Sequence, residues 1–105
     1  MTFARISVCT AMERNRALSE AREAITGSGG WIVDHKLFSN AMATLNFEVP
    51  AGKAETLVAR LEQAGLQPET GADFPPGGTG DLRGQITLTF IHREPDLKRE
   101  VPAFG

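Results

Sequence analysis

The sequence predicts a single mixed α+β domain in which two helices cover one face of a four-stranded antiparallel sheet. Four segments have strand patterns and two have an amphipathic helical pattern, in the order strand, helix, strand, strand, helix, strand. This is the order of the ferredoxin-like βαββαβ fold, in which right-handed crossovers give the strand order 4-1-3-2. We therefore expect the first and third strands to be central and the second and fourth to form the edges.

Length and composition restrict the protein class. With 105 residues the chain has room for one domain, which we place at residues 1–92, followed by an extended tail at residues 93–105. The net charge of −2 does not favour a nucleic-acid partner. The single cysteine, Cys9, excludes an internal disulfide, and no apolar run approaches the ~20 residues that span a bilayer. We expect a cytoplasmic protein with no membrane partner.

The first two elements are a strand and a helix. Residues 2–10 alternate between apolar and polar, which predicts a strand with one face on the core. Residues 13–26 repeat apolar side chains at helical spacing, which predicts an amphipathic helix. We expect Thr10, in a capping box, or Asn15 to cap its start, and Gly27 to end it in a left-handed turn. The inward residues are Ala4, Ile6 and Val8 in the strand and Ala17, Leu18, Ala21, Ala24 and Ile25 in the helix.

A hairpin follows the first helix. Residues 31–38 have the β-branched and aromatic content of a strand, and Ser39-Asn40 supplies a turn. Residues 43–49 then alternate cleanly until Pro50 ends the second strand of the pair. In the first strand of the hairpin we expect one set of residues to face inward, namely Trp31, Val33, His35 and Leu37.

The second half ends in a helix, a loop and a strand. Residues 53–64 predict a helix that Gly65 terminates, and residues 66–84, dense in Gly and Pro, predict a long loop. Residues 85–92 alternate as the last strand, which we expect at an edge of the sheet. The predicted core of the domain contains Ile6, Leu18, Ile25, Leu45, Phe47, Leu57, Leu61 and Leu88.

Several kinds of site are excluded by structural context. The glycine clusters at residues 27–30 and 77–80 lead into strands, whereas a phosphate-binding loop opens a helix. The expected fold places His35 and His92 on opposite edges of the sheet, about 14 Å apart, too far to share a metal ion with Cys9. The open face of the sheet lacks the aromatic platform that stacks on RNA bases. The sequence therefore indicates no metal site and no cofactor.

One stretch of the chain resembles a known family. Residues 30–66, a hairpin whose second strand ends in Phe47-Glu48-Val49-Pro50 and a helix closing on Ala64-Gly65-Leu66, resemble the second half of an ACT-type regulatory domain. The turn Glu13-Arg14-Asn15-Arg16-Ala17-Leu18 looks like the Asp-Arg-Pro-Gly-x-Leu turn of that family, with Asn15 in place of its proline and Arg16 in place of its glycine. The similarity extends over residues 3–92.

The resemblance implies a function. ACT domains bind amino acids or other small effectors at that first turn, commonly across a dimer interface, and have no catalytic activity of their own. By resemblance, the ligand-binding residues are Glu13, Arg14, Asn15 and Arg16. We therefore expect a non-catalytic domain that binds an amino acid, another small carboxylate or a protein partner.

An alternative function shares the element order and length. Enzymes of the dimeric α+β barrel type, such as small monooxygenases and isomerases, have a pocket between sheet and helices, where Trp31 and His35 would be inward candidates. The way subunits pair distinguishes the two functions, because the barrel enzymes pair their sheets face to face. We expect a homodimer through the second strand, Trp31 to Phe38, because a long edge with few charges is an aggregation hazard unless it is paired.

Overall fold

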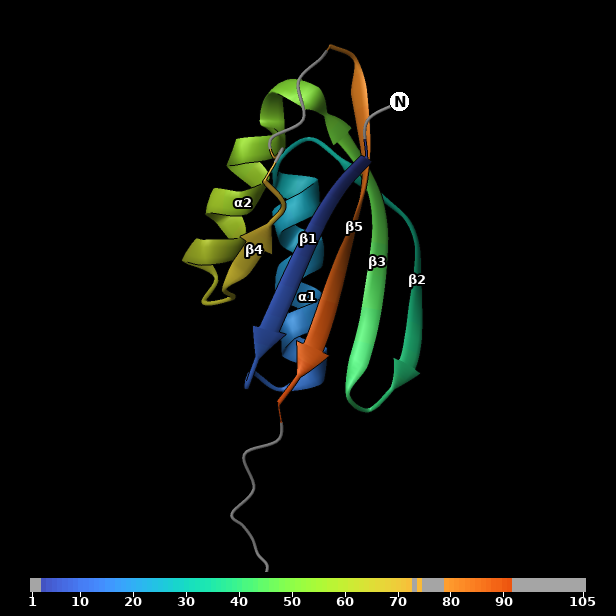
Figure 1. The fold of residues 1–105 in the computed structure, drawn as a ribbon, viewed down its shortest axis with the longest axis vertical. Helices are drawn as coiled ribbons and strands as arrows, with labels where there is room; N and C mark the ends of the chain where they lie inside the picture. Colours follow the sequence, from blue (N-terminus) through green and yellow to red (C-terminus); the bar gives the residue numbers. More distant parts are fainter. Residues whose placement is uncertain (1–2, 73, 75–78, 92–105) are drawn as a thin grey trace, which may run out of the picture.

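The computed structural model describes residues 3–72, 74 and 79–91, and these residues form a five-stranded sheet and two α-helices (Figure 1). The α+β class is therefore confirmed, whereas residue 92 and the predicted tail at residues 93–105 lie outside the described residues. In chain order the elements are β1 (Phe3–Thr10), α1 (Arg14–Gly27), β2 (Trp31–Ser39), β3 (Met42–Pro50), the 3-10 turn η1 (Ala51–Lys53), α2 (Ala54–Gln63), β4 (Pro68–Thr70) and β5 (Asp81–Phe90).

The predicted strand number and strand order are wrong. The observed order is β2-β3-β5-β1-β4, so the last strand lies in the centre of the sheet instead of at an edge. It runs parallel to β1, from the pair Phe3↔Arg83 to the pair Thr10↔Phe90, and antiparallel to β3. The edge position expected for the last strand is taken by β4, which pairs with β1 through three residues of the predicted loop.

The central position of β5 follows from its length and its apolar face. The strand begins at Asp81, four residues earlier than predicted, so Leu82 and Gly84 extend the buried row formed by Ile86, Leu88 and Phe90. Gly84 allows its neighbours to approach closely. A Cβ atom there would lie 2.5 Å from Cζ of Phe47 and 2.8 Å from the backbone oxygen of Ala4. A glycine inside a strand often marks such an approach of backbone and side chain.

Both helices pack on the same face of the sheet (Figure 1). The stripe of α1 meets the alternating inward residues of β1, β3 and β5, and α2 adds Ala54, Leu57 and Leu61. Each residue of the predicted core is buried, which confirms the inward faces of these five elements. Neither helix is long and apolar enough to cross a membrane, among the residues that the structure describes.

The ends of the helices differ from prediction at one glycine and one cap. Glu13, not Thr10 or Asn15, caps α1. The helix continues through Gly27, and the left-handed residue is Gly29, with a φ of 86°. Gly65, after α2, has a φ of 94° and ends that helix as predicted.

The expected burial of one face of β2 is also wrong. Trp31, Val33, His35 and Leu37 are exposed, and only Ile32 of this strand is half-buried. The ladder between β2 and β3 shifts register between Ile32 and Asp34 and again between Leu37 and Ser39, so the alternation is interrupted twice. Because β2 is an edge strand, the two helices cover little of its helix-facing side. Period-two patterning therefore does not determine burial here.

Candidate functional site

The candidate site lies where β1 and β5 end. Because these strands are parallel neighbours, their carboxyl ends meet at the same edge of the sheet, and the Ile91 amide donates a hydrogen bond of 2.8 Å to the Thr10 carbonyl. Crevices at the carboxyl ends of parallel strands are frequent ligand sites. A hollow of about 430 Å³ lies here. Its lining residues are Cys9, Thr10, Ala11, Met12, Arg16, Gly65, Gln67 and Ile91.

The turn between β1 and α1 forms one wall of the hollow. The Thr10 hydroxyl oxygen accepts a hydrogen bond of 3.0 Å from the Met12 amide, which fixes the start of the turn. The Glu13 carboxylate then accepts hydrogen bonds of 3.0 Å from the amides of both Asn15 and Arg16. These bonds satisfy two of the amides that a helix start leaves without partners. They fix the first turn of α1, whose Arg16 side chain lines the hollow.

The segment between α2 and β4 also lines the hollow. Gly65 adopts a left-handed conformation and its amide donates to the Glu62 carbonyl at 3.1 Å, while the Leu66 amide donates to the Leu61 carbonyl at 3.1 Å. Leu66 is buried and anchors this turn to the core. Gln67 follows directly and lines the hollow.

The four ligand residues implied by the sequence resemblance do not act as one group. Arg16 lines the hollow. Arg14 instead donates from Nη1 to Oδ1 of Asn40 at 3.1 Å, which directs it to the turn between β2 and β3. Glu13 is the helix cap, and Asn15 contributes its backbone amide to that cap. Ligand binding by these residues stays a prediction, and the geometry favours Arg16 for it.

The charge at this helix start is already partly compensated. Hydrogen bonds from the Asn15 and Arg16 amides, together with the nearby Arg14 charge, hold the pKa of Glu13 below its ordinary value of 4.5. The carboxylate therefore stays ionised at neutral pH and occupies the amides that an external anion would otherwise use. The guanidinium of Arg16 is consequently the charged group that the lining offers to a ligand.

The rest of the lining was not predicted from the sequence. Gln67 lay in the expected loop, and Ile91 was assigned to an edge strand, so neither could be placed beside Arg16. Only the parallel pairing of β1 with β5 could have indicated these positions, and no local sequence pattern predicts that pairing. Together the lining offers one cation, one side-chain amide, a thiol and the apolar surface of Met12 and Ile91.

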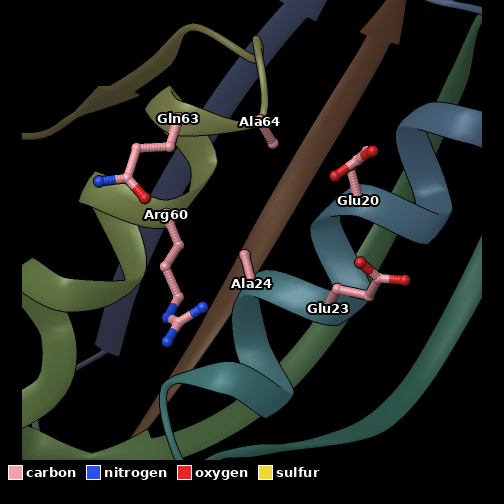
Figure 2. A pocket seen from close by; sticks show the side chains of 6 residues that line it. All are labelled: Glu20, Glu23, Ala24, Arg60, Gln63 and Ala64. Atoms are coloured by element: carbon pink, nitrogen blue, oxygen red, sulfur yellow. The ribbon is translucent and has the colours of Figure 1, made fainter.

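A second, smaller hollow lies between the helices (Figure 2). It has a volume of about 220 Å³ and is lined by Glu20, Glu23, Ala24, Arg60, Gln63 and Ala64. In Figure 2 Arg60 extends from α2 toward the last turn of α1. A Cβ atom on Gly27 would lie 2.8 Å from its Nη1 atom. The guanidinium therefore sits at the negative end of α1, a stabilising place for a cation, and we assign this hollow a structural role.

Neither a metal group nor a known relative identifies the function. The described part of the chain contains no cluster of three or more His, Cys, Asp or Glu residues that could hold a metal ion. Cys9 lies on β1 and His35 on the distant edge strand β2, while His92 is outside the described residues. Comparisons with protein-family models, curated proteins and solved structures find no match to the chain.

Proposed function

We propose that this chain is a non-catalytic domain, ACT-like in its use of the first turn, that binds a small carboxylate-bearing molecule in the hollow at the ends of β1 and β5. The supporting observation is that Arg16, one of the residues implied by the sequence resemblance, lines this hollow, as Gln67 does. A guanidinium can hold a carboxylate with two parallel hydrogen bonds, and a side-chain amide can add a further bond. Met12 and Ile91 suit an apolar ligand portion, which makes an amino acid the first class to test.

The chemistry of the lining favours binding over catalysis. Its eight residues include one permanent charge, Arg16, and hydrogen-bonding groups, which can recognise and orient an anion. General acid–base catalysis would use a titratable pair near neutral pH, and the lining contributes no Asp, Glu or His to such a pair. The inward candidates of the alternative barrel enzyme, Trp31 and His35, are exposed on β2, so no observation favours that function.

The experiment is a thermal-shift screen of amino acids and small carboxylates, followed by calorimetric titration of the hits. A ligand at ~100 times its dissociation constant adds ~2.7 kcal/mol to the free energy of unfolding, which raises the Tm by ~10 °C or more. Replacing Arg16 with Ala should weaken binding by about 10- to 100-fold, because a hydrogen bond to a charged group contributes ~1.5–3 kcal/mol.

Arg14→Ala is the matched control. It removes the same charge two positions away, from a side chain that donates to Asn40 instead of lining the hollow. Its affinity for the hit should stay within about threefold of the wild-type value, a change no larger than that of a typical surface substitution. A ligand whose affinity falls equally in both variants responds to net charge only, and a screen without hits up to millimolar concentrations contradicts the proposal.

A further inference from the structure

The outer edge of β2 presents backbone groups and apolar side chains together. Its nine residues pair with β3 on one side only, so the N–H and C=O groups of the other side have no strand partner within the described residues. Val33, Leu37 and Phe38 are 54%, 54% and 60% exposed. Edge strands in monomeric proteins are usually protected by charges, proline or short length. This edge is long, and among its nine residues the only Asp, Glu, Lys or Arg side chains are those of Asp34 and Lys36.

The charges on this edge are arranged symmetrically. Asp34 and Lys36 pair with Asn46 and Thr44 of β3, so both lie on the open face of the sheet, on either side of His35. Consider two β2 strands paired antiparallel, with His35 of one copy opposite His35 of the other. Asp34 of each copy is then directly opposite Lys36 of the other copy, which gives two such pairs. The same pairing brings Val33, which lies at the first register shift of β2, near Leu37 of the other copy. Opposite-charge and apolar cross-strand pairs both stabilise a sheet.

The irregularities of β2 leave this centre intact. The two register shifts fall at Val33 and at Phe38, and the stretch between them, Asp34 to Leu37, pairs regularly with β3. Two-fold pairing of this stretch gives the free β2 edge of each copy a strand partner, so neither β2 edge remains open. The other edge of the sheet, β4, has three residues beginning with Pro68, so it offers little to a further copy. The assembly therefore closes at two chains.

We infer that two copies of this chain form a dimer by antiparallel pairing of their β2 strands about His35, which joins the two sheets edge to edge. The occupant is a second copy because the edge is complementary to itself, in charge and in apolar pairs. This inference is independent of ligand binding at Arg16, and the two proposals can fail separately. On the open face of the sheet, Gln85 donates a hydrogen bond to Asn46 at 3.1 Å and Asn46 donates one to Asp34 at 2.6 Å, so these side chains are already linked within one chain.

A charge-exchange experiment tests the pairing and its register. In Lys36→Asp each cross-pair between positions 34 and 36 consists of two carboxylates, and in Asp34→Lys each consists of two ammonium groups. Both variants should therefore dimerise at least about tenfold more weakly than wild type, because like charges directly opposite each other repel. An equimolar mixture restores both opposite-charge pairs and should form heterodimers with near wild-type affinity. The double variant Asp34→Lys/Lys36→Asp restores them within one chain. Sedimentation velocity measures all four states.

Cross-linking provides a second measurement that does not depend on charge. In a Cys9→Ser background, which removes the exposed native thiol, His35→Cys should form an intermolecular disulfide under mild oxidation because paired Cα atoms lie about 4.5–5.5 Å apart. Lys36→Cys is the matched control. The Cα atoms of position 36 in the two copies would lie about 8 Å apart, beyond the reach of a disulfide.

Three outcomes overturn the inference. A wild-type monomer at high micromolar concentration excludes the dimer, and a dimer whose variants do not complement each other excludes this register. Equal cross-linking at positions 35 and 36 shows random collision or another interface, such as face-to-face packing of the open sheet faces. Complementation in the mixture together with cross-linking specific to position 35 supports it, whether or not Arg16 binds a ligand.

Discussion

A single carboxylate, that of Glu13, determines where α1 begins. Its folded pKa is lowered, first by the hydrogen bond from the Asn15 amide and then by that from Arg16. The stabilisation is therefore fully present above the ordinary pKa of 4.5 and is lost as the pH falls through the lower folded pKa. We expect Glu13→Gln to lower the Tm at pH 7 and this difference to shrink by about pH 3.

Glu20→Gln is the control for this change, because Glu20 lies further along α1 and does not cap it. Thermal unfolding followed by circular dichroism, with each variant compared to wild type at each pH, separates the cap from general acid unfolding. A Tm difference for Glu13→Gln that is equal at both pH values would mean that the charge of the carboxylate does not stabilise the helix start.

Gly84 is the second residue on which the fold depends. A methyl group there meets the Phe47 ring at 2.5 Å and the Ala4 carbonyl oxygen at 2.8 Å, and the backbone of β1 cannot move away without breaking its ladder with β5. Gly84→Ala should cost about 1–3 kcal/mol of unfolding free energy, as overpacking does. Gly52→Ala, whose added Cβ meets nothing within 4 Å, is the control and should leave the denaturant midpoint almost unchanged.

At this scale the sequence predicts burial well and interactions poorly. Alternation identified Ile6, Leu45 and Phe47 as core because an apolar side chain in a covered strand has one favourable side. The resemblance of residues 13–18 to the ACT turn separately indicated Arg16. The Arg14 to Asn40 hydrogen bond could not be predicted, since it joins residues that only the tertiary fold brings together.

Among the elements, β5 should tolerate interruption least. Thr87 pairs with Ser7 of β1 on one side and Thr44 of β3 on the other, so a proline there removes a ladder hydrogen bond whichever way its amide points. We expect Thr87→Pro to lack cooperative thermal unfolding. Thr70→Pro, in the edge strand β4, pairs only with Ile6 and should remain folded with a modestly lower Tm. A folded Thr87→Pro protein would contradict the central position of β5.

The order of the elements could be predicted from sequence, but not their places in the sheet. Period and turn residues indicate each strand separately, whereas neighbours are chosen by the summed packing of whole faces. Residues 66–84 illustrate the limit, because Gly and Pro suggested a loop while Pro68–Thr70 pair with β1 and Asp81–Gly84 begin β5. For β2, alternation placed His35 and Leu37 on the side of the buried Leu45 and Ala43, but an edge strand has little to bury them.

For the whole molecule, stability should depend on protein concentration if two chains pair through β2. A tenfold dilution changes the free energy of dissociation by ~1.4 kcal/mol per dimer, which should lower the Tm by a few degrees. Lys36→Asp should have a lower Tm than wild type at the same concentration, and its Tm should begin to rise with concentration only at about tenfold higher concentrations. Differential scanning calorimetry over a hundredfold range measures both, and a concentration-independent wild-type Tm would contradict a dimer that persists in the folded state.

The parallel pairing of the first and last strands has a consequence for how the chain folds during synthesis. The ladder that joins Phe3 to Arg83 and Thr10 to Phe90 cannot form until the last of these residues has left the ribosome. Until then β1 and β3 have no common partner, and their apolar faces are open to other chains. Contacts between such distant residues also slow the search for the native state. The sheet of the nascent chain is therefore completed only after Phe90 has emerged from the ribosome.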